Sequence, residues 1–210
     1  MAGNQEYFNR RLHSLLGIIP IGIFLVMHLS INYFATRGAE SFNQAAHFME
    51  NLPFRYAMEI FIIFLPILYH GIYGIYIAFT AKNNIQRYGT FRNWMFALQR
   101  FTGVFLLIFI TWHVYETRFQ AALGNAEVNY NMMADILSSP FMLVFYIVGV
   151  ISATFHLANG LWSFLVSWGI TVTPRSQRIA TYATIALFLA LTYVGLSATF
   201  AFINPELANM

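Results

Sequence analysis

The sequence contains no cysteine among its 210 residues. This absence excludes disulfide bonds, thiolate ligation of haem, c-type haem attachment and an iron–sulfur cluster held by this chain. Any redox centre in the protein must therefore be held by histidine or methionine side chains.

Charged residues are also scarce. They make up 9% of the chain, whereas soluble domains have about a quarter, and 59% of the residues are hydrophobic with a mean hydropathy of +0.60. This composition predicts an integral membrane protein. The net charge of +3 is small and lies mostly in short loops, so it indicates membrane orientation and not nucleic-acid binding. No linker, low-complexity tract or repeat divides the chain, and we expect one transmembrane domain over residues 1–210.

Five apolar stretches are long enough to cross the hydrocarbon layer, which takes about 20 helical residues. The predicted fold is therefore an all-α bundle of five transmembrane helices, at about 14–33, 56–80, 94–115, 140–168 and 179–203. The first stretch exceeds the roughly 7–15 apolar residues of a signal peptide, which favours an uncleaved helix.

The basic residues predict the orientation of the bundle. The N-terminus, the loop 81–93 and the loop 169–178 share one side and hold eight of the eleven basic residues, counting Arg100 at the adjoining helix end. The positive-inside rule therefore predicts a cytoplasmic N-terminus and an outer C-terminus. In the first outer loop, apolar residues recur at helical spacing and predict a short surface helix, namely Phe42, Ala45, Ala46, Met49 and Leu52. The second outer loop, 119–139, is less periodic.

Four histidines, His28, His70, His113 and His156, lie one apiece in the first four predicted helices. Imidazole is costly to place in hydrocarbon, and a set of four calls for a functional explanation. Axial ligation of two b-type haems, with two histidines to each iron, accounts for the number. A single such histidine would more simply be explained by a hydrogen bond between helices.

The depth of each histidine predicts how they pair. His28 lies nine residues before Arg37 and His113 five before Arg118, so both are within roughly 7–14 Å of the outer boundary. His70 follows Arg55 by fifteen residues and His156 follows Pro140 by sixteen, which places both roughly 22–24 Å from that boundary. We therefore expect an outer haem on His28 and His113, and an inner haem on His70 and His156.

Other metal and proton chemistry fits this pattern less well. Zinc takes three or four ligands at one point, which two separated pairs do not supply, whereas a proton relay through histidines stays open. Gly74 and Gly160 each follow an inner histidine by one helical turn, where a missing side chain could admit a flat macrocycle or serve ordinary helix packing.

Polar residues near the two levels supply further candidates. Glu59 precedes His70 by nearly three full turns and Glu116 follows His113 by three residues, so both approach the outer level, where a carboxylate could exchange protons with a quinone. Alternatively, Glu59 pairs with Arg55 at i, i+4. At the cytoplasmic helix ends, donors for haem propionates, or simply solvated side chains, are His13, Ser14, Trp94, Arg92 and Arg100. His13 and His47 fall outside the predicted spans and are not expected to be axial ligands.

The segments RRLHSLLG, LPFRYAMEIFIIFLP, IAFTAKNN, FRNWMFALQR, NGLWSF and TVTPRSQRI, together with the four helical histidines, closely resemble the di-haem cytochrome b subunit of bacterial succinate dehydrogenase. The resemblance runs nearly end to end and is strongest to the single-chain, five-helix type of menaquinone-using Gram-positive bacteria. The axial ligands of that family carry over onto His28, His70, His113 and His156.

The resemblance implies partners and an electron path. Similar proteins dock a flavoprotein and an iron–sulfur subunit on the cytoplasmic face. Electrons from succinate pass to the inner haem, then the outer haem, then menaquinone near the outer surface. Succinate oxidation would occur in the flavoprotein, since this chain has no dinucleotide-binding fingerprint; this chain would be a non-dehydrogenase subunit that performs electron transfer and quinone reduction.

Two other functional classes stay open at this point. The chain could be the b-type cytochrome subunit of a hydrogenase, formate dehydrogenase or fumarate reductase, which uses the same haem chemistry with different partners. It could also be a transporter or a haem-free structural protein with histidines in a relay.

Overall fold

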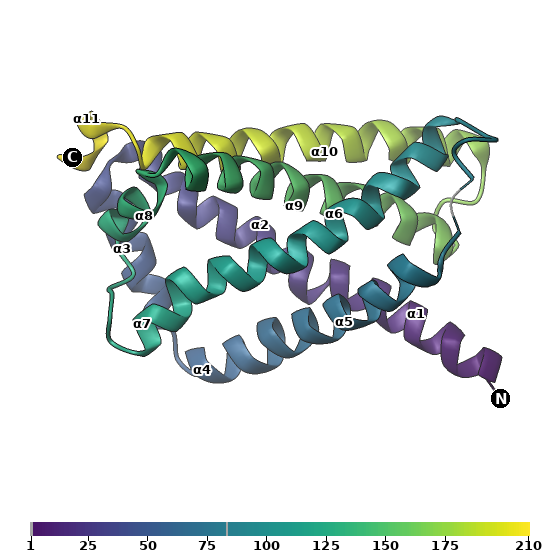
Figure 1. Cartoon of the computed structure of the whole chain (residues 1–210), viewed down its shortest axis with the longest axis horizontal. Helices are drawn as coiled ribbons and strands as arrows, with labels where there is room; N and C mark the ends of the chain where they lie inside the picture. The colour runs from purple at the N-terminus through teal and green to yellow at the C-terminus, as the bar shows by residue number, and fades with distance from the viewer. Residues whose placement is uncertain (1, 83) are drawn as a thin grey trace.

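The computed structural model describes residues 2–82 and 84–210, and every regular element within them is helical. Five helical spans in this part of the chain are long and apolar enough to cross a membrane, and they run side by side along the molecule (Figure 1). Their bounds are Gly3–Arg37, Arg55–Thr80, Phe91–Ala122, Pro140–Ser167 and Pro174–Ala201. The predicted all-α class and the five spans are confirmed.

The first span is made of α1 (Ala2–Ile18), α2 (Pro20–Asn32) and the 3-10 turn η1 (Tyr33–Arg37). Helical structure breaks at Pro20, which has no backbone N–H to continue the ladder. The predicted start at residue 14 is wrong, because hydropathy reports the part of a helix that lies in hydrocarbon and not its full length. The polar N-terminal turns of α1 project beyond the bundle and carry an i, i+4 ion pair between Glu6 and Arg10 at 2.8 Å (Figure 1).

The second and third spans each contain a π-helical segment that the sequence did not indicate. The second comprises α4 (Arg55–Met58), the π segment η2 (Glu59–Phe64) and α5 (Leu65–Thr80). The third comprises α6 (Phe91–Val114), the π segment η3 (Tyr115–Phe119) and α7 (Gln120–Ala122). Such segments are rare and frequently occur at functional sites.

The last two spans, α9 (Pro140–Ser167) and α10 (Pro174–Ala201), pack closely along their lengths. Small residues allow this approach, since a Cβ on Gly195 would lie 2.5 Å from a methyl group of Val150. The predicted start of the fifth helix at residue 179 is wrong. Thr173 and Ser176 form a capping box around Pro174, which begins the helix five residues earlier.

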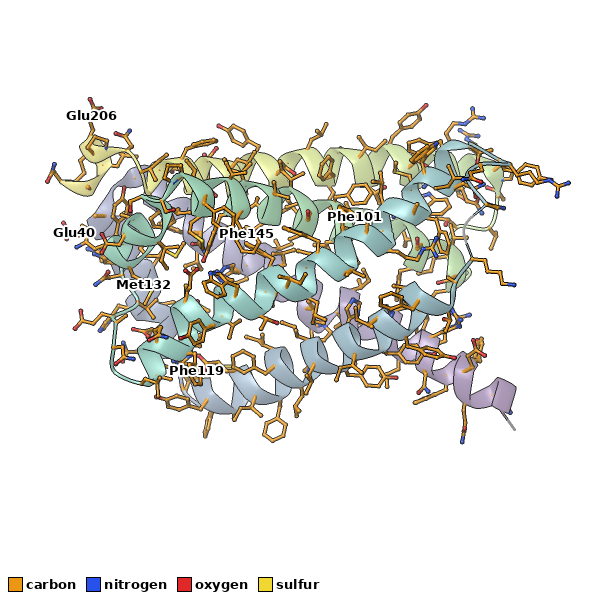
Figure 2. The ribbon with its side chains drawn as sticks, in the orientation of Figure 1. Glu40, Phe101, Phe119, Met132, Phe145 and Glu206 are labelled. Carbon is orange, nitrogen blue, oxygen red and sulfur yellow. The ribbon has the colours of Figure 1, made fainter. Side chains whose placement is uncertain are left out.

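Short helices cover the end of the bundle near the C-terminus (Figure 1). They are α3 (Ala39–Glu50), α8 (Tyr130–Leu137) and α11 (Pro205–Ala208). The short helix predicted in this loop is present as α3, which buries Phe42 against Phe202, whereas α8 was not predicted. Burial raises the pKa of Tyr130, whose protonated hydroxyl donates to the Ala201 carbonyl. Figure 2 shows Glu40, Met132 and Glu206 at this end, which we call the acidic end.

The opposite end, which we call the basic end, gathers the N-terminal half of α1 and the connections that follow α5 and α9. The Arg11 guanidinium lies 4.9 Å from the Trp168 ring centroid, and the Trp168 indole N–H donates to the Ser14 hydroxyl at 3.3 Å. Nearby, the Arg100 side chain donates to the Ala81 carbonyl at 2.8 Å. The two ends of the molecule therefore differ in charge as the sequence predicted.

Candidate paired-histidine centres

The four helical histidines meet as two pairs inside the bundle. His28 on α2 faces His113 on α6, with ring centroids 5.8 Å apart and ring planes at 74°. His70 on α5 faces His156 on α9, with centroids 6.1 Å apart and planes at 82°. We call these the outer pair and the inner pair. The structure brings together the partners that depth along the helices predicted.

The spacing of each pair fits two ligands on opposite sides of one metal ion. A metal–nitrogen bond is about 2 Å and an imidazole nitrogen lies about 1.1 Å from the ring centroid, so two such rings have centroids about 6 Å apart. Both observed distances agree with this value. Among the described residues no group of three or more His, Asp or Glu is placed to hold a metal ion, so the arrangement is two separate two-histidine sites.

The separation between the two pairs along the bundle follows from the positions of two glycines. Gly17 on α1 lies against the His70 ring, and Gly103 on α6 lies against the His156 ring. Gly17 precedes His28 by eleven residues and Gly103 precedes His113 by ten. Both helices therefore place the two pairs about 15 Å apart along the bundle.

Hydrogen bonds fix the protonation of both rings in the inner pair. His70 Nδ1 lies 3.0 Å from the His13 carbonyl oxygen, which can only accept, so Nδ1 carries the proton. His156 Nδ1 lies 3.2 Å from the Thr102 hydroxyl, whose own proton goes to the Leu98 carbonyl at 2.8 Å. Each inner imidazole thus keeps an unprotonated Nε2, which is the atom a metal ion would take.

At the outer pair, a hydrogen bond at Nδ1 orients one of the two rings. His113 Nδ1 lies 3.1 Å from the Tyr146 hydroxyl, and that hydroxyl donates to a Glu116 carboxylate oxygen at 3.4 Å. The His113 N–H therefore donates to the Tyr146 oxygen. On His28 the Asn32 amide donates to the main-chain carbonyl at 2.8 Å and lies 3.4 Å from Nε2, so the two rings of this pair are held in different ways.

The glycines closest to the inner imidazoles differ from those that the sequence suggested. A Cβ on Gly17 would lie 2.5 Å from His70 Cε1, and one on Gly103 would lie 3.0 Å from His156 Cε1. Gly74 instead faces the His13 ring at 3.2 Å and Gly160 faces the Gln99 amide at 3.3 Å. Gly74 and Gly160 thus pack on neighbouring polar side chains, which agrees with the alternative of ordinary helix packing.

The predicted propionate donors divide into two groups. His13 stacks on His70 with centroids 4.0 Å apart and planes at 7°, so it lies beside the inner pair, whereas the Ser14 hydroxyl accepts from the Trp168 indole N–H. Trp94 is about half exposed, while Arg100 is bonded to the Ala81 carbonyl and lies 4.4 Å from the Phe96 ring centroid. Arg92 is engaged elsewhere, with its guanidinium 3.5 Å from the Trp162 ring centroid. His47 lies on α3, outside the five spans.

Glu59 forms its shortest ion pair with Arg118, a partner that was not predicted from the sequence. Arg118 binds it through two nitrogens, with Nη2–Oε2 at 2.8 Å and Nε contacts at 3.1 Å. The predicted Arg55 contact is present but longer, at 3.7 Å. The pair joins η2 to η3, so both π segments meet at this charge cluster. Spacing along one helix could not reveal a partner on another helix.

Comparison with known proteins gives two agreeing matches. Residues 80–195 match the family described as succinate dehydrogenase/fumarate reductase transmembrane subunit. Over 203 residues the chain is 68% identical to a Bacillus subtilis (strain 168) protein described as succinate dehydrogenase cytochrome b558 subunit, an alignment that covers 97% of this chain and 100% of the relative.

Proposed function

This chain belongs to the family of succinate dehydrogenase and fumarate reductase transmembrane subunits, and on that basis we propose that it is the di-haem cytochrome b anchor of a succinate:menaquinone oxidoreductase. Its role is to carry electrons from an iron–sulfur partner to menaquinone. The relative's description as a cytochrome b558 supports haem b as the cofactor. The match to a succinate dehydrogenase subunit favours this assignment over a hydrogenase or formate dehydrogenase.

The observation that carries the proposal is the pair of two-histidine sites. In each, two imidazoles face one another at the spacing of two ligands on one metal ion. In His70, His156 and His113, a hydrogen bond at Nδ1 leaves Nε2 as the acceptor. A bound haem b supplies a one-electron carrier at each site, and two sites in series span the depth between the basic and acidic ends. His28 and His113 would hold the outer group, and His70 and His156 would hold the inner group.

The basic end of the bundle is proposed to face the cytoplasm and to receive the iron–sulfur and flavoprotein subunits. Its exposed guanidinium and aromatic side chains come from α1, from the connection before α6 and from the connection before α10. The four acidic–basic ion pairs in the described residues leave Arg11, Arg175 and Arg178 without a carboxylate partner. This excess of positive charge supports a cytoplasmic position and a negatively charged docking partner.

The acidic end is proposed to exchange protons with menaquinone. Reduction of a quinone consumes two protons, and carboxylates near the outer pair can relay them. Glu59 and Glu116 both lie at this level, and the ion pair with Arg118 holds Glu59 in place. The two π segments at this point support a functional role for the cluster.

The proposal is tested by a reduced-minus-oxidised optical spectrum of the purified complex together with its haem content. We expect b-type bands and two haems per copy of this chain, with a co-purifying flavoprotein that oxidises succinate. One haem per chain would remove one of the two sites. Absence of b-type bands would refute the haem assignment, and a nickel enzyme as co-purifying partner would refute the succinate dehydrogenase assignment.

A further inference from the structure

We propose that Tyr146 is a positioning residue for the outer site, where it orients His113 and links this ligand to the Glu116 carboxylate. The inference rests on the proposed haem ligation by His113 and goes beyond it. It assigns a function to a tyrosine that lies on a different helix from either outer ligand. It also predicts a difference in redox behaviour between the two sites.

The hydrogen bonds run in one direction from the ligand to the carboxylate. The Tyr146 hydroxyl lies 3.1 Å from His113 Nδ1 and donates its single proton to Glu116 Oε2 at 3.4 Å. It must therefore accept from the His113 N–H. This bond fixes the tautomer of His113 and leaves Nε2 for the metal. Partners of this type orient a ligating histidine and increase its basicity.

Packing holds the tyrosine in this position. Tyr146 is 4% exposed, and its ring meets Phe109 edge-on with centroids 5.3 Å apart. Phe109 in turn stacks beside the His113 ring, with centroids 5.9 Å apart. Phe109 also packs on Gly149, where an added Cβ would lie 2.3 Å from the Phe109 ring. These aromatic side chains therefore prevent rotation of the Tyr146 side chain and keep its hydroxyl within hydrogen-bond distance of His113 Nδ1.

The corresponding bonds of the inner pair end on neutral groups. His70 donates to the main-chain carbonyl of His13, and His156 donates to the Thr102 hydroxyl, which in turn donates to the Leu98 carbonyl. Of the hydrogen bonds from His70, His156 and His113, the one from His113 leads through Tyr146 to a carboxylate. A histidine polarised toward a carboxylate is a stronger donor and favours ferric over ferrous iron. Tyr146 should therefore lower the potential of the outer site.

The experiment is a redox titration of the full complex carrying Tyr146→Phe, read by optical and low-temperature EPR spectra. We expect both haems to be retained. The midpoint potential of one haem should shift to a more positive value, and its EPR signal should change because the His113 ring is no longer held. The other haem should keep its wild-type potential and signal. The affected haem should be the one that is lost in His113→Ala.

Two further variants separate this role from a general packing effect. Glu116→Gln keeps the tyrosine and should shift the same haem in the same direction but by less. Thr102→Val, the matched change at the inner pair, should move only the other haem. If Tyr146→Phe fails to assemble, the Glu116→Gln titration decides the question.

An unchanged outer potential and EPR signal in Tyr146→Phe, or in Glu116→Gln where that variant decides, would overturn the inference. Equal shifts of both haems in Tyr146→Phe would overturn it as well. Absence of haem from the wild-type complex would instead contradict the proposed function, so failure of the inference and failure of the proposed function are distinguishable.

Discussion

The inner and outer histidine pairs have nearly the same ring spacing, 6.1 Å and 5.8 Å, yet they are built from different surroundings. At the inner pair, glycines on α1 and α6 press against both imidazoles, and His13 stacks on one of them. At the outer pair, the rings meet Phe24, Phe109 and Tyr146, and Glu116 lies one helical turn after His113. The spacing between two ligands is therefore kept while the packing and the charge around them differ.

The inner pair should be the more sensitive to added volume. In Gly17→Ala the new Cβ would overlap His70 Cε1 at 2.5 Å, and the imidazole would have to leave its position. Overpacking of this kind costs about 1–3 kcal/mol. We expect loss or strong perturbation of one haem, measured by haem content and redox titration, with the outer haem intact. Gly3→Ala, where no atom lies within 4 Å of the new Cβ, is the control. Equal haem loss in both variants would contradict direct contact with His70.

The same change at the outer pair should act indirectly. Gly149→Ala would place a Cβ 2.3 Å from the Phe109 ring, which must shift and thereby disturb His113 and Tyr146. We expect a destabilisation of about 1–3 kcal/mol. Spectra should show an altered outer haem and an unaltered inner one. An altered inner haem would show that the two sites are not structurally independent.

The charge cluster at the acidic end should affect turnover and not haem binding. Removing a group that transfers protons typically lowers rates about 10²–10⁴-fold, and we expect a loss in this range for quinone reduction by Glu59→Gln, with both haems present. Arg118→Gln removes the main partner of Glu59 but leaves Arg55 at 3.7 Å, so its effect should be smaller. Equal losses in the two variants would indicate that the ion pair serves structure alone. Normal turnover in Glu59→Gln would remove this residue from the mechanism.

The depth of each histidine along its helix could be predicted from the sequence because the rise per helical residue is constant. For this reason the four histidines could be paired before any contact was known. Rotation about the helix axis was not predictable in the same way. Contact of Gly17 and Gly103 with the inner imidazoles was therefore not predicted, since each lies on a different helix from the ring that it touches.

Contacts between helices were missed for the same reason. The i, i+4 partner of Glu59 could be proposed from spacing, but the stronger partner, Arg118, comes from another span and lies within a π segment. Tyr146 likewise gave no signal in the sequence, since its importance depends on facing His113 across two helices. The helix ends at residues 2 and 174 were misplaced because polar or proline-containing turns continued the helices beyond the apolar stretches.

The most direct test of the two-pair arrangement is a redox titration of four complexes, each with one of His28, His70, His113 or His156 changed to alanine. We expect His28→Ala and His113→Ala to remove or shift the same haem, and His70→Ala and His156→Ala to remove or shift the other. Grouping in any other way, for example His28 with His70, would contradict the structure of the two sites.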